Sequence, residues 1–186
     1  MVNLFFLHQE PQVSASWYFD SHMKIIVEGG QILSTVWWVN HPSMKEMYEK
    51  EIYKPFKATT HPMILWAREK RDNYMYTCDL CLELCKEFER RYGHLHKTKK
   101  VLLWLKNNVP YSFDRNSFED TKKIVTRQPL FNSNYETTPV PLCMPEDCFG
   151  QNLIESNRNY YIHKKMERPE QFKHRKTPPP EWLCLY

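Results

Sequence analysis

Glycine is scarce in this chain of 186 residues, which contains 4 glycines, and long apolar runs are missing. So few glycines argue against the glycine-rich phosphate loops on which many nucleotide-binding folds depend. No run approaches the roughly 18 apolar residues of a membrane helix. The N-terminal MVNLFFLHQE also lacks the basic start and apolar core of a signal peptide. The sequence therefore predicts an intracellular protein with no membrane partner, whose 6 cysteines are reduced thiols.

Familiar enzyme motifs are also absent, since the chain has no P-loop, nucleophile elbow, HExxH or kinase signature. The charge balance excludes little, because 26 basic residues against 22 acidic ones give a net charge of +4. Such a charge permits contact with nucleic acid but does not require it. Aromatic residues are abundant, with 6 Trp, 11 Tyr and 10 Phe, and a chain of this length can bury a real core.

Apolar periodicity predicts an all-α fold, a compact multi-helix single domain that spans residues 1–186. The expected helices cover residues 17–38, 43–54, 62–92, 97–106 and 151–166. Residues 109–150 contain five prolines and no sustained period, which predicts a long irregular wrap with a short helix at 117–126. The basic, proline-rich tail at 167–186 ends in apolar residues, so we expect it to dock back onto the body.

The predicted helix at 17–38 is apolar on most faces but carries one polar stripe at helical spacing. The stripe consists of Asp20, Lys24, Glu28, Gln31 and Thr35. A buried helix must pair such charges internally or turn them toward a polar cavity. The spacing allows a self-satisfied ion-pair ladder from Asp20 through Lys24 to Glu28. The alternative is a desolvated Glu28 whose pKa rises toward neutrality, suited to acid–base catalysis with Lys24 as its electrostatic partner.

Two adjacent glycines, Gly29 and Gly30, interrupt the same predicted helix. Together they cost roughly 2 kcal/mol relative to alanine in a helix interior. Both lie away from the polar stripe, which favours the close approach of another helix over a kink. His22 projects to the opposite side of the helix from the stripe, so we expect a hydrogen-bonded core histidine.

Three cysteines share the apolar stripe of the predicted 62–92 helix, namely Cys78, Cys81 and Cys85. Zinc knuckles usually hold CxxC in a turn and need a second pair, so this spacing predicts core packing. Cys143 and Cys148 flank a Met-Pro loop and could in principle join His94 or His96 around a metal. We nevertheless predict no bound metal and no cofactor.

Aromatic and basic side chains are interleaved on two of the predicted helices. One set lies on the 62–92 helix and contains Trp66, Arg68, Arg71, Asn73 and Tyr74. The other lies on the 151–166 helix and contains Arg158, Asn159, Tyr160, Tyr161, His163, Lys164 and Lys165. Arginine and lysine bind phosphate, and aromatic rings stack on unpaired bases, although either set could be a solvated basic face. His96 stands in a basic run at a helix start, where a phosphate contact is reasonable.

Several segments together resemble a family of small, mostly uncharacterised proteins of tailed phages and large DNA viruses. The matching pieces are Asp20-Ser21-His22, Lys24, Glu28, Gln31 to Thr35, His61-Pro62, Trp66, Arg68, Asn73-Tyr74, Glu87, Arg91-Tyr92-Gly93, His96, Met144-Pro145, Arg158 to Tyr161 and Pro180-Glu181-Trp182. This chain has Ser21 where the family more often has lysine, and it departs freely between residues 108 and 143. The resemblance implies a viral protein that acts in the host cytoplasm or nucleus.

That family is distantly similar to the viral pyrimidine-dimer DNA glycosylase/AP lyases, which are all-α and cofactor-free. By this resemblance Glu28 takes the role of the catalytic glutamate. The nucleophile is the α-amine of Val2 if Met1 is removed, and part of an α-amine is neutral at pH 7. The nucleophile of that distant family is threonine, so Val2 departs from it.

The functional expectation is a nucleic-acid-processing enzyme related to DNA repair, with DNA as its partner. Its substrate-binding residues would be Asp20, Gln31, Trp66, Arg68, Arg71, Asn73, Arg91, His96, Arg158 and Tyr160. The alternative is a non-enzymatic viral accessory protein that binds nucleic acid or a host partner. The sequence leaves the oligomeric state open.

Overall fold

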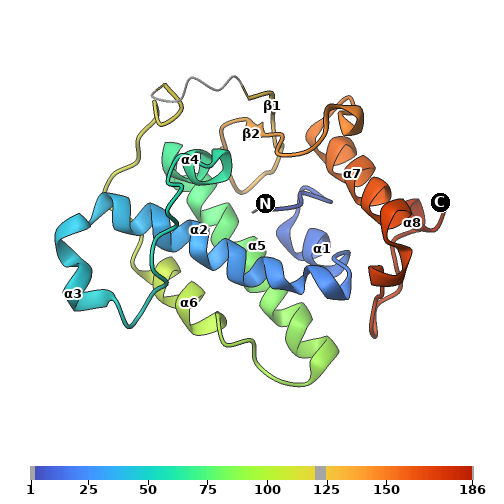
Figure 1. Cartoon of the computed structure of the whole chain (residues 1–186), viewed down its shortest axis with the longest axis horizontal. Coiled ribbons are helices and arrows are strands. Elements are labelled where there is room, and N and C mark those ends of the chain that lie inside the picture. The colour runs from blue at the N-terminus through green and yellow to red at the C-terminus, as the bar shows by residue number, and fades with distance from the viewer. Residues whose placement is uncertain (1–2, 120–124, 186) are drawn as a thin grey trace.

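The computed structural model describes residues 3–119 and 125–185, apart from the side chains of residues 45 and 46. This part of the chain is mostly helical and contains one small antiparallel sheet (Figure 1). The elements are α1 (Pro11–Ser16), α2 (Ile25–Asn40), α3 (Lys45–Tyr48), α4 (Pro62–Glu69), α5 (Arg71–Tyr92), α6 (Lys99–Asn107), β1 (Arg127–Gln128), β2 (Val140–Pro141), α7 (Leu153–Glu167) and α8 (Glu181–Cys184). The expectation of a helical protein is confirmed at this level.

The core is built around α5, which crosses behind α2 and also contacts α1, α4 and α6. Its predicted stripe is buried, because Tyr74, Cys78, Cys81 and Cys85 are each 0% exposed. The helix ends at Gly93, whose φ of 78° is the left-handed conformation that glycine adopts without a steric penalty. The three cysteines therefore pack in the core, as predicted.

The extended segment at residues 4–7 passes through this core, and all four of its side chains are buried. Buried backbone N–H groups need partners, and side chains from distant elements supply them. The Phe5 N–H donates to the Tyr18 hydroxyl at 2.7 Å, and the Phe6 N–H donates to the Asn157 side-chain oxygen at 3.1 Å. The N-terminal segment is thereby fixed against both α7 and Tyr18, which follows α1.

The predicted continuous helix at 17–38 is wrong in its first third. Helix α1 ends before Trp17, Phe19 is extended, and a 3-10 turn, η1 (Asp20–Lys24), precedes α2. The Asp20 N–H donates to the Lys173 carbonyl at 2.7 Å instead of entering an α-helical ladder. A partner from the C-terminal tail therefore breaks the helix that local periodicity favoured, and the polar stripe is divided.

The close approach predicted at the two glycines is confirmed. A Cβ added to Gly29 would lie 2.2 Å from the Cys81 sulfur, and one added to Gly30 would lie 2.8 Å from a Thr98 methyl carbon. Helix α2 thus touches α5 through a contact that only a residue without a side chain allows.

Three other predicted boundaries differ from those observed. The helix at 62–92 divides at Lys70, which is extended, into α4 and α5. The helix at 43–54 is limited to Lys45–Tyr48, preceded by a 3-10 turn. The short helix predicted at 117–126 lies partly outside the described residues, and residues 115–119 form turns. Propensity alone does not set such ends, because tertiary contacts override it.

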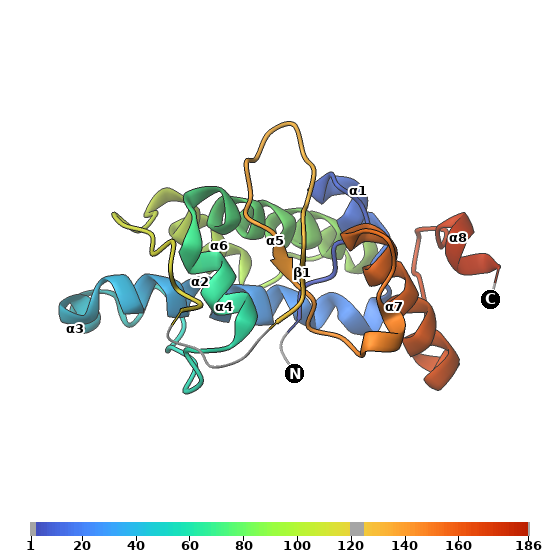
Figure 2. The same cartoon turned by 90° about the horizontal axis from the view of Figure 1, so that it is seen from above.

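The described residues between 109 and 150 are mainly irregular, with β1 and β2 as their paired segment. The tail ends in α8, where Leu183 is 2% exposed and its carbonyl accepts a hydrogen bond from Lys165 at 2.8 Å. Figure 2 places α7 and α8 at the end of the molecule opposite α3. In the part of the chain that the structure describes, no helix has both the length and the apolar character needed to cross a membrane.

Candidate functional site

A cavity of about 170 Å³ lies where the N-terminal segment, the start of α2 and α7 meet. Its lining residues are Asn3, Phe5, His22, Lys24, Ile25, Glu28, Tyr160 and Lys164. We call it the Glu28 cavity. Of the residues predicted to carry chemistry or bind substrate, it brings together Glu28, Lys24 and Tyr160.

The carboxyl of Glu28 is half-buried in this cavity. One of its oxygens, Oε2, accepts a hydrogen bond from the Asn3 N–H at 3.4 Å. Burial raises the pKa of Glu28, and the Asn3 N–H and the Lys24 charge only partly oppose that rise. The group therefore keeps its proton to a higher pH than an exposed glutamate, a property required of a general acid.

The proposed ladder from Asp20 through Lys24 to Glu28 is not formed. Among the described residues, Lys24 has no ion pair within 4 Å to either carboxylate, and Asp20 pairs with Arg91 and Arg175 instead. The exposed Lys24 remains close enough to Glu28 to lower the pKa of its carboxyl. Glu28 consequently faces a cation without being neutralised by a direct ion pair.

Helix α7 supplies a second cation to the cavity through Lys164. The ammonium of Lys164 lies 4.6 Å from the centre of the Tyr160 ring, at the i,i+4 spacing that puts both on one face. An adjoining cavity of about 230 Å³ shares Lys24 and Lys164 and is also lined by Arg168. Three cations therefore line the two cavities together with one acidic residue besides Glu28, namely Glu167.

His22 lies between these cavities and lines both. Its Nδ1 is 3.1 Å from the Tyr161 hydroxyl, and the residue is 9% exposed, as expected of a hydrogen-bonded core histidine. Burial, followed by the charges of Lys164 and Lys24, lowers the pKa of His22 to about 2. The imidazole is neutral near pH 7, so His22 shapes the cavity without adding a charge.

Asp20 and Arg91 form a separate buried cluster with Glu87. The Arg91 guanidinium is 2% exposed and donates to Glu87 Oε1 at 2.6 Å, Asp20 Oδ1 at 3.1 Å and the Ser16 carbonyl at 3.0 Å. We call this the Arg91 network. These contacts occupy both predicted binding residues, and neither lines the Glu28 cavity.

The predicted aromatic–basic set on α4 and α5 is held by the irregular segment. The Trp66 indole N–H donates to the Thr138 carbonyl at 3.0 Å, and the Asn73 side chain bonds to both Trp66 and Thr138. Arg68 pairs with Asp114 at 3.6 Å, and Arg71 is exposed at the start of α5. Trp66 and Asn73 are 0% exposed, so in this conformation neither can meet a base.

Two further predicted residues also lie apart from the cavity. His96 is half-buried, its Nδ1 accepts from the Thr98 N–H at 3.2 Å, and burial lowers its pKa. Gln31 is half-buried on α2. The Val2 amine, the predicted nucleophile, lies outside the described residues. The sequence analysis named Lys164 in a basic run but not as a site residue. Its i,i+4 spacing from Tyr160 could have indicated that both side chains lie on one face of α7.

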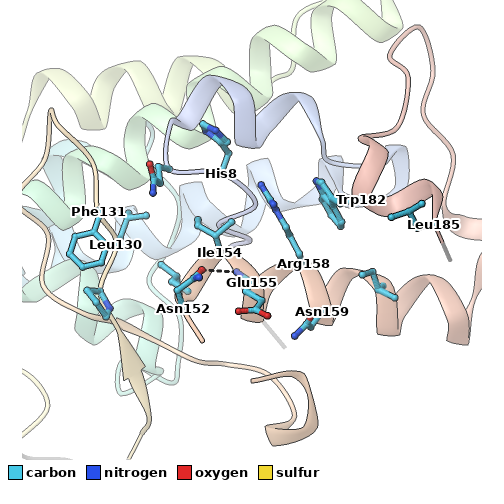
Figure 3. Close-up of a pocket in the computed structure, with 14 residues that line it drawn as sticks. His8, Leu130, Phe131, Asn152, Ile154, Glu155, Arg158, Asn159, Trp182 and Leu185 are labelled. Carbon is cyan, nitrogen blue, oxygen red and sulfur yellow. Dashed lines mark hydrogen bonds between the residues drawn. The ribbon is translucent and has the colours of Figure 1, made fainter. Parts of the chain in front are cut away.

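Arg158 belongs to a different and larger hollow, a groove of about 690 Å³ between the irregular segment, α7 and α8. Figure 3 shows Arg158 rising from α7 between His8 and Trp182. Its Nε donates to the Leu7 carbonyl at 3.0 Å, and its guanidinium lies 5.1 Å from the Trp17 ring centre. The predicted basic face of α7 is thus divided between two hollows.

Comparison with family models, with curated proteins and with solved structures gave no match. The function must therefore be argued from the site itself.

Proposed function

We propose that the Glu28 cavity is the catalytic centre of an enzyme that acts on nucleic acid at a base or an abasic site. The observation that carries this proposal is the half-buried Glu28 carboxyl, with its raised pKa and two neighbouring lysines. A carboxyl in such surroundings can give a proton to a leaving group and later take one back.

The Asn3 N–H, at 3.4 Å from Glu28 Oε2, supports a role for the N-terminal amine. In a chain that begins at Val2, the free amine would belong to the residue directly before Asn3 in the sequence. This is the pairing of groups that the resemblance to DNA glycosylase/AP lyases implies.

In the proposed reaction the neutral amine attacks the sugar C1′. The bond from C1′ to the base breaks, and Glu28 protonates the departing base. As the bond from C1′ to the ring oxygen O4′ breaks, one proton of the amine passes to O4′, which leaves a protonated imine between the chain and C1′. The Glu28 carboxylate then takes a proton from C2′, and the 3′ phosphate leaves by elimination. No oxidant or metal is needed for these steps.

The flanking side chains fit a nucleic-acid substrate. Lys24, Lys164 and Arg168 surround the two adjoining cavities and can neutralise phosphates. Tyr160 lines the Glu28 cavity and offers a ring for an extruded base. We propose DNA as the partner, and a viral protein acting inside the host cell as the setting.

Borohydride trapping tests the proposal. The purified chain is mixed with oligonucleotides that carry an abasic site, a pyrimidine dimer or an oxidised base, and reduced. We expect a covalent adduct at the N-terminal residue, located by peptide mass spectrometry. Glu28→Gln should lower the rate at least about 100-fold, whereas Glu49→Gln, on an exposed and distant glutamate, should leave it unchanged.

Absence of an adduct on every lesion would overturn the enzyme proposal. An adduct that forms equally fast in Glu28→Gln would remove Glu28 from the mechanism. A chain with two extra N-terminal residues tests the role of the amine separately from the stability of the fold. It should melt at the same temperature as the parent chain but should no longer be trapped by borohydride.

A second candidate, a non-enzymatic accessory protein, is favoured by the size of the groove of about 690 Å³ that Arg158 lines. Phe131 is 69% exposed and Leu185 is 80% exposed at its lining, an apolar pair that a protein partner could cover. Salt dependence separates the candidates. Binding to DNA through the lysines should weaken steeply with salt and fall in Lys164→Ala. If DNA binding does not change with salt, and if binding is lost in Phe131→Ala, a protein partner would be favoured.

A further inference from the structure

Three side chains of metal-binding type meet where the end of the irregular segment touches α7. Asp147 and Cys148 belong to a 3-10 turn, η3 (Glu146–Cys148), and His163 projects from α7. One ligand atom from each lies within 4.8 Å of the other two. This is the one such group found among the described residues, and it does not include the cysteines of the α5 stripe.

The backbone holds this group in place without any ion. The Cys148 N–H donates to the Pro145 carbonyl at 3.0 Å and closes the turn. The Cys148 carbonyl accepts from the Asn159 side chain at 3.4 Å, which ties the turn to α7 one helical turn before His163. The thiol and the imidazole are therefore brought to one place by elements that the rest of the fold already fixes.

A fourth side chain, Glu167, contacts the histidine of the group, as carboxylates commonly do behind the histidine ligands of metal sites. Glu167 Oε1 lies 3.2 Å from His163 Nε2, at i,i+4 on the last turn of α7. A carboxylate on a histidine ring fixes its orientation and raises its basicity as a ligand. The Cys148 thiol donates to the Asp147 carboxylate, with its sulfur 3.7 Å from Oδ1. The thiol, the carboxylate and the imidazole therefore already converge on one place.

We propose that Asp147, Cys148 and His163 bind a zinc ion. One sulfur, one nitrogen and one carboxylate oxygen suit Zn²⁺ rather than Ca²⁺ or Mg²⁺, which take oxygen ligands. Ligand bonds of about 2.0–2.3 Å require ligand atoms roughly 3.3–3.6 Å apart. The ligand atoms lie within 4.8 Å of one another, so side-chain rotations that move them about 1 Å closer would bring them to these distances. Three protein ligands leave one position for water.

The consequence of binding is mechanical. The ion would join η3 to the C-terminal half of α7, next to Lys164 on the same helix. It would therefore stiffen the end of the irregular segment and the helix that lines the Glu28 cavity. The inference does not depend on the proposed enzyme activity, because its readouts are metal binding and thermal stability.

The test is a titration of the full chain, stripped with a chelator, with Co²⁺ and then Zn²⁺. We expect one equivalent of Co²⁺ with a thiolate-to-cobalt charge-transfer band, displacement of Co²⁺ by Zn²⁺, and a higher Tm with Zn²⁺ than without. Absence of the band at one equivalent, with Tm unchanged, would overturn the site.

Variants locate the ion. Cys148→Ser should abolish the band, and Glu167→Gln should weaken binding about 10–100-fold through the histidine. Cys143→Ser and Cys184→Ser are matched controls that should keep the band. Because Cys148 is 3% exposed, its variant could fold poorly, so His163→Gln, at a side chain 36% exposed, provides a second removal of a ligand. A band that survives either removal would contradict the assignment.

Discussion

The Arg91 network on α5 and the Glu28 cavity on α2 each hold a glutamate, and the pKa values of the two carboxyls are shifted in opposite directions. In the network, burial alone would raise the pKa of Glu87, but hydrogen bonds from Arg90, Thr177 and Arg91 outweigh it and leave that pKa low. In the cavity, burial outweighs the Asn3 N–H and Lys24, and the pKa of Glu28 is raised. Burial acts in the same direction on both carboxyls, and the outcomes differ because Glu87 has guanidinium partners and Glu28 does not.

This difference separates a structural role from a chemical one. A carboxylate neutralised by arginine on several sides is a poor proton donor and a strong anchor. A carboxyl whose pKa is raised beside a cavity lined by lysines can take part in proton transfer. The two regions can be tested against each other by substitutions whose effects on folding should differ in size and sign.

The largest expected effect is that of Arg91→Ala. Removing this guanidinium leaves the Asp20 and Glu87 carboxylates without their buried partner, which should cost about 3–5 kcal/mol of unfolding free energy. Chemical denaturation measures the loss. Arg90→Ala removes the other partner of Glu87 from a side chain 44% exposed and should cost about 1 kcal/mol or less. Equal losses in both variants would show that Arg91 is not the centre of the network.

A smaller loss is expected for Gly29→Ala, which tests the contact that holds α2 on α5 between the two regions. The added Cβ would lie 2.2 Å from the Cys81 sulfur. Overpacking of this kind costs about 1–3 kcal/mol, and the better helix propensity of alanine returns about 1 kcal/mol. Adding Cys81→Ala should recover part of the loss in a double-mutant cycle. Simple additivity would contradict the proposed clash.

His22 predicts a loss of stability in acid. Its folded pKa of about 2 lies below its ordinary value of 6.5, so below pH 6.5 the unfolded chain takes up a proton that the folded one does not. Stability should fall as the pH drops through this window, by at most about 1.4 kcal/mol per pH unit. Melting curves of His22→Gln should lack this part of the slope, and His94→Gln, at an exposed histidine, should retain it.

The smallest effect on folding is expected for Glu28→Gln. Because the folded pKa of Glu28 is raised, its contribution to stability is lost as the pH rises from about 4.5 through that raised value. The variant should match the parent in acid and gain less than about 1 kcal/mol near pH 8. Glu87→Gln should do the opposite and lose stability at the higher pH, since the pKa of Glu87 is lowered. A large loss in Glu28→Gln would instead assign Glu28 to the framework.

Local pattern was sufficient wherever the determining contacts follow from helical periodicity. The cysteine stripe of α5, the helix at α7 and the close approach at Gly29 were all predictable in this way. Helix ends were less predictable, because Lys70 and Phe19 leave the helical conformation where distant segments pack on them.

The candidate site was predictable in its central residue and not in its surroundings. Spacing predicted either an ion-pair ladder or a desolvated Glu28 without deciding between them, and it also placed Asp20 on the same stripe. Trp66 and Asn73 looked accessible for binding, since nothing local indicates that Thr138, 65 residues from Asn73, covers them. The group of Asp147, Cys148 and His163 was likewise invisible, because the turn and the helix meet only in the folded chain.

Residue spacing alone predicts that this protein is mainly helical, that the cysteines of α5 are buried and that another helix packs closely on the glycines of α2. These features depend on residues a few positions apart, which any helix brings together. Which carboxyl is paired with arginine, and that the helix against Gly29 is α5, depend on the folded chain. Asp20 meets Arg91 from 71 residues away and the Arg175 backbone from 155 residues away, whereas Glu28 meets a cavity with two lysines. Whether a carboxylate is paired with a cation depends on residues that are distant from it in the sequence.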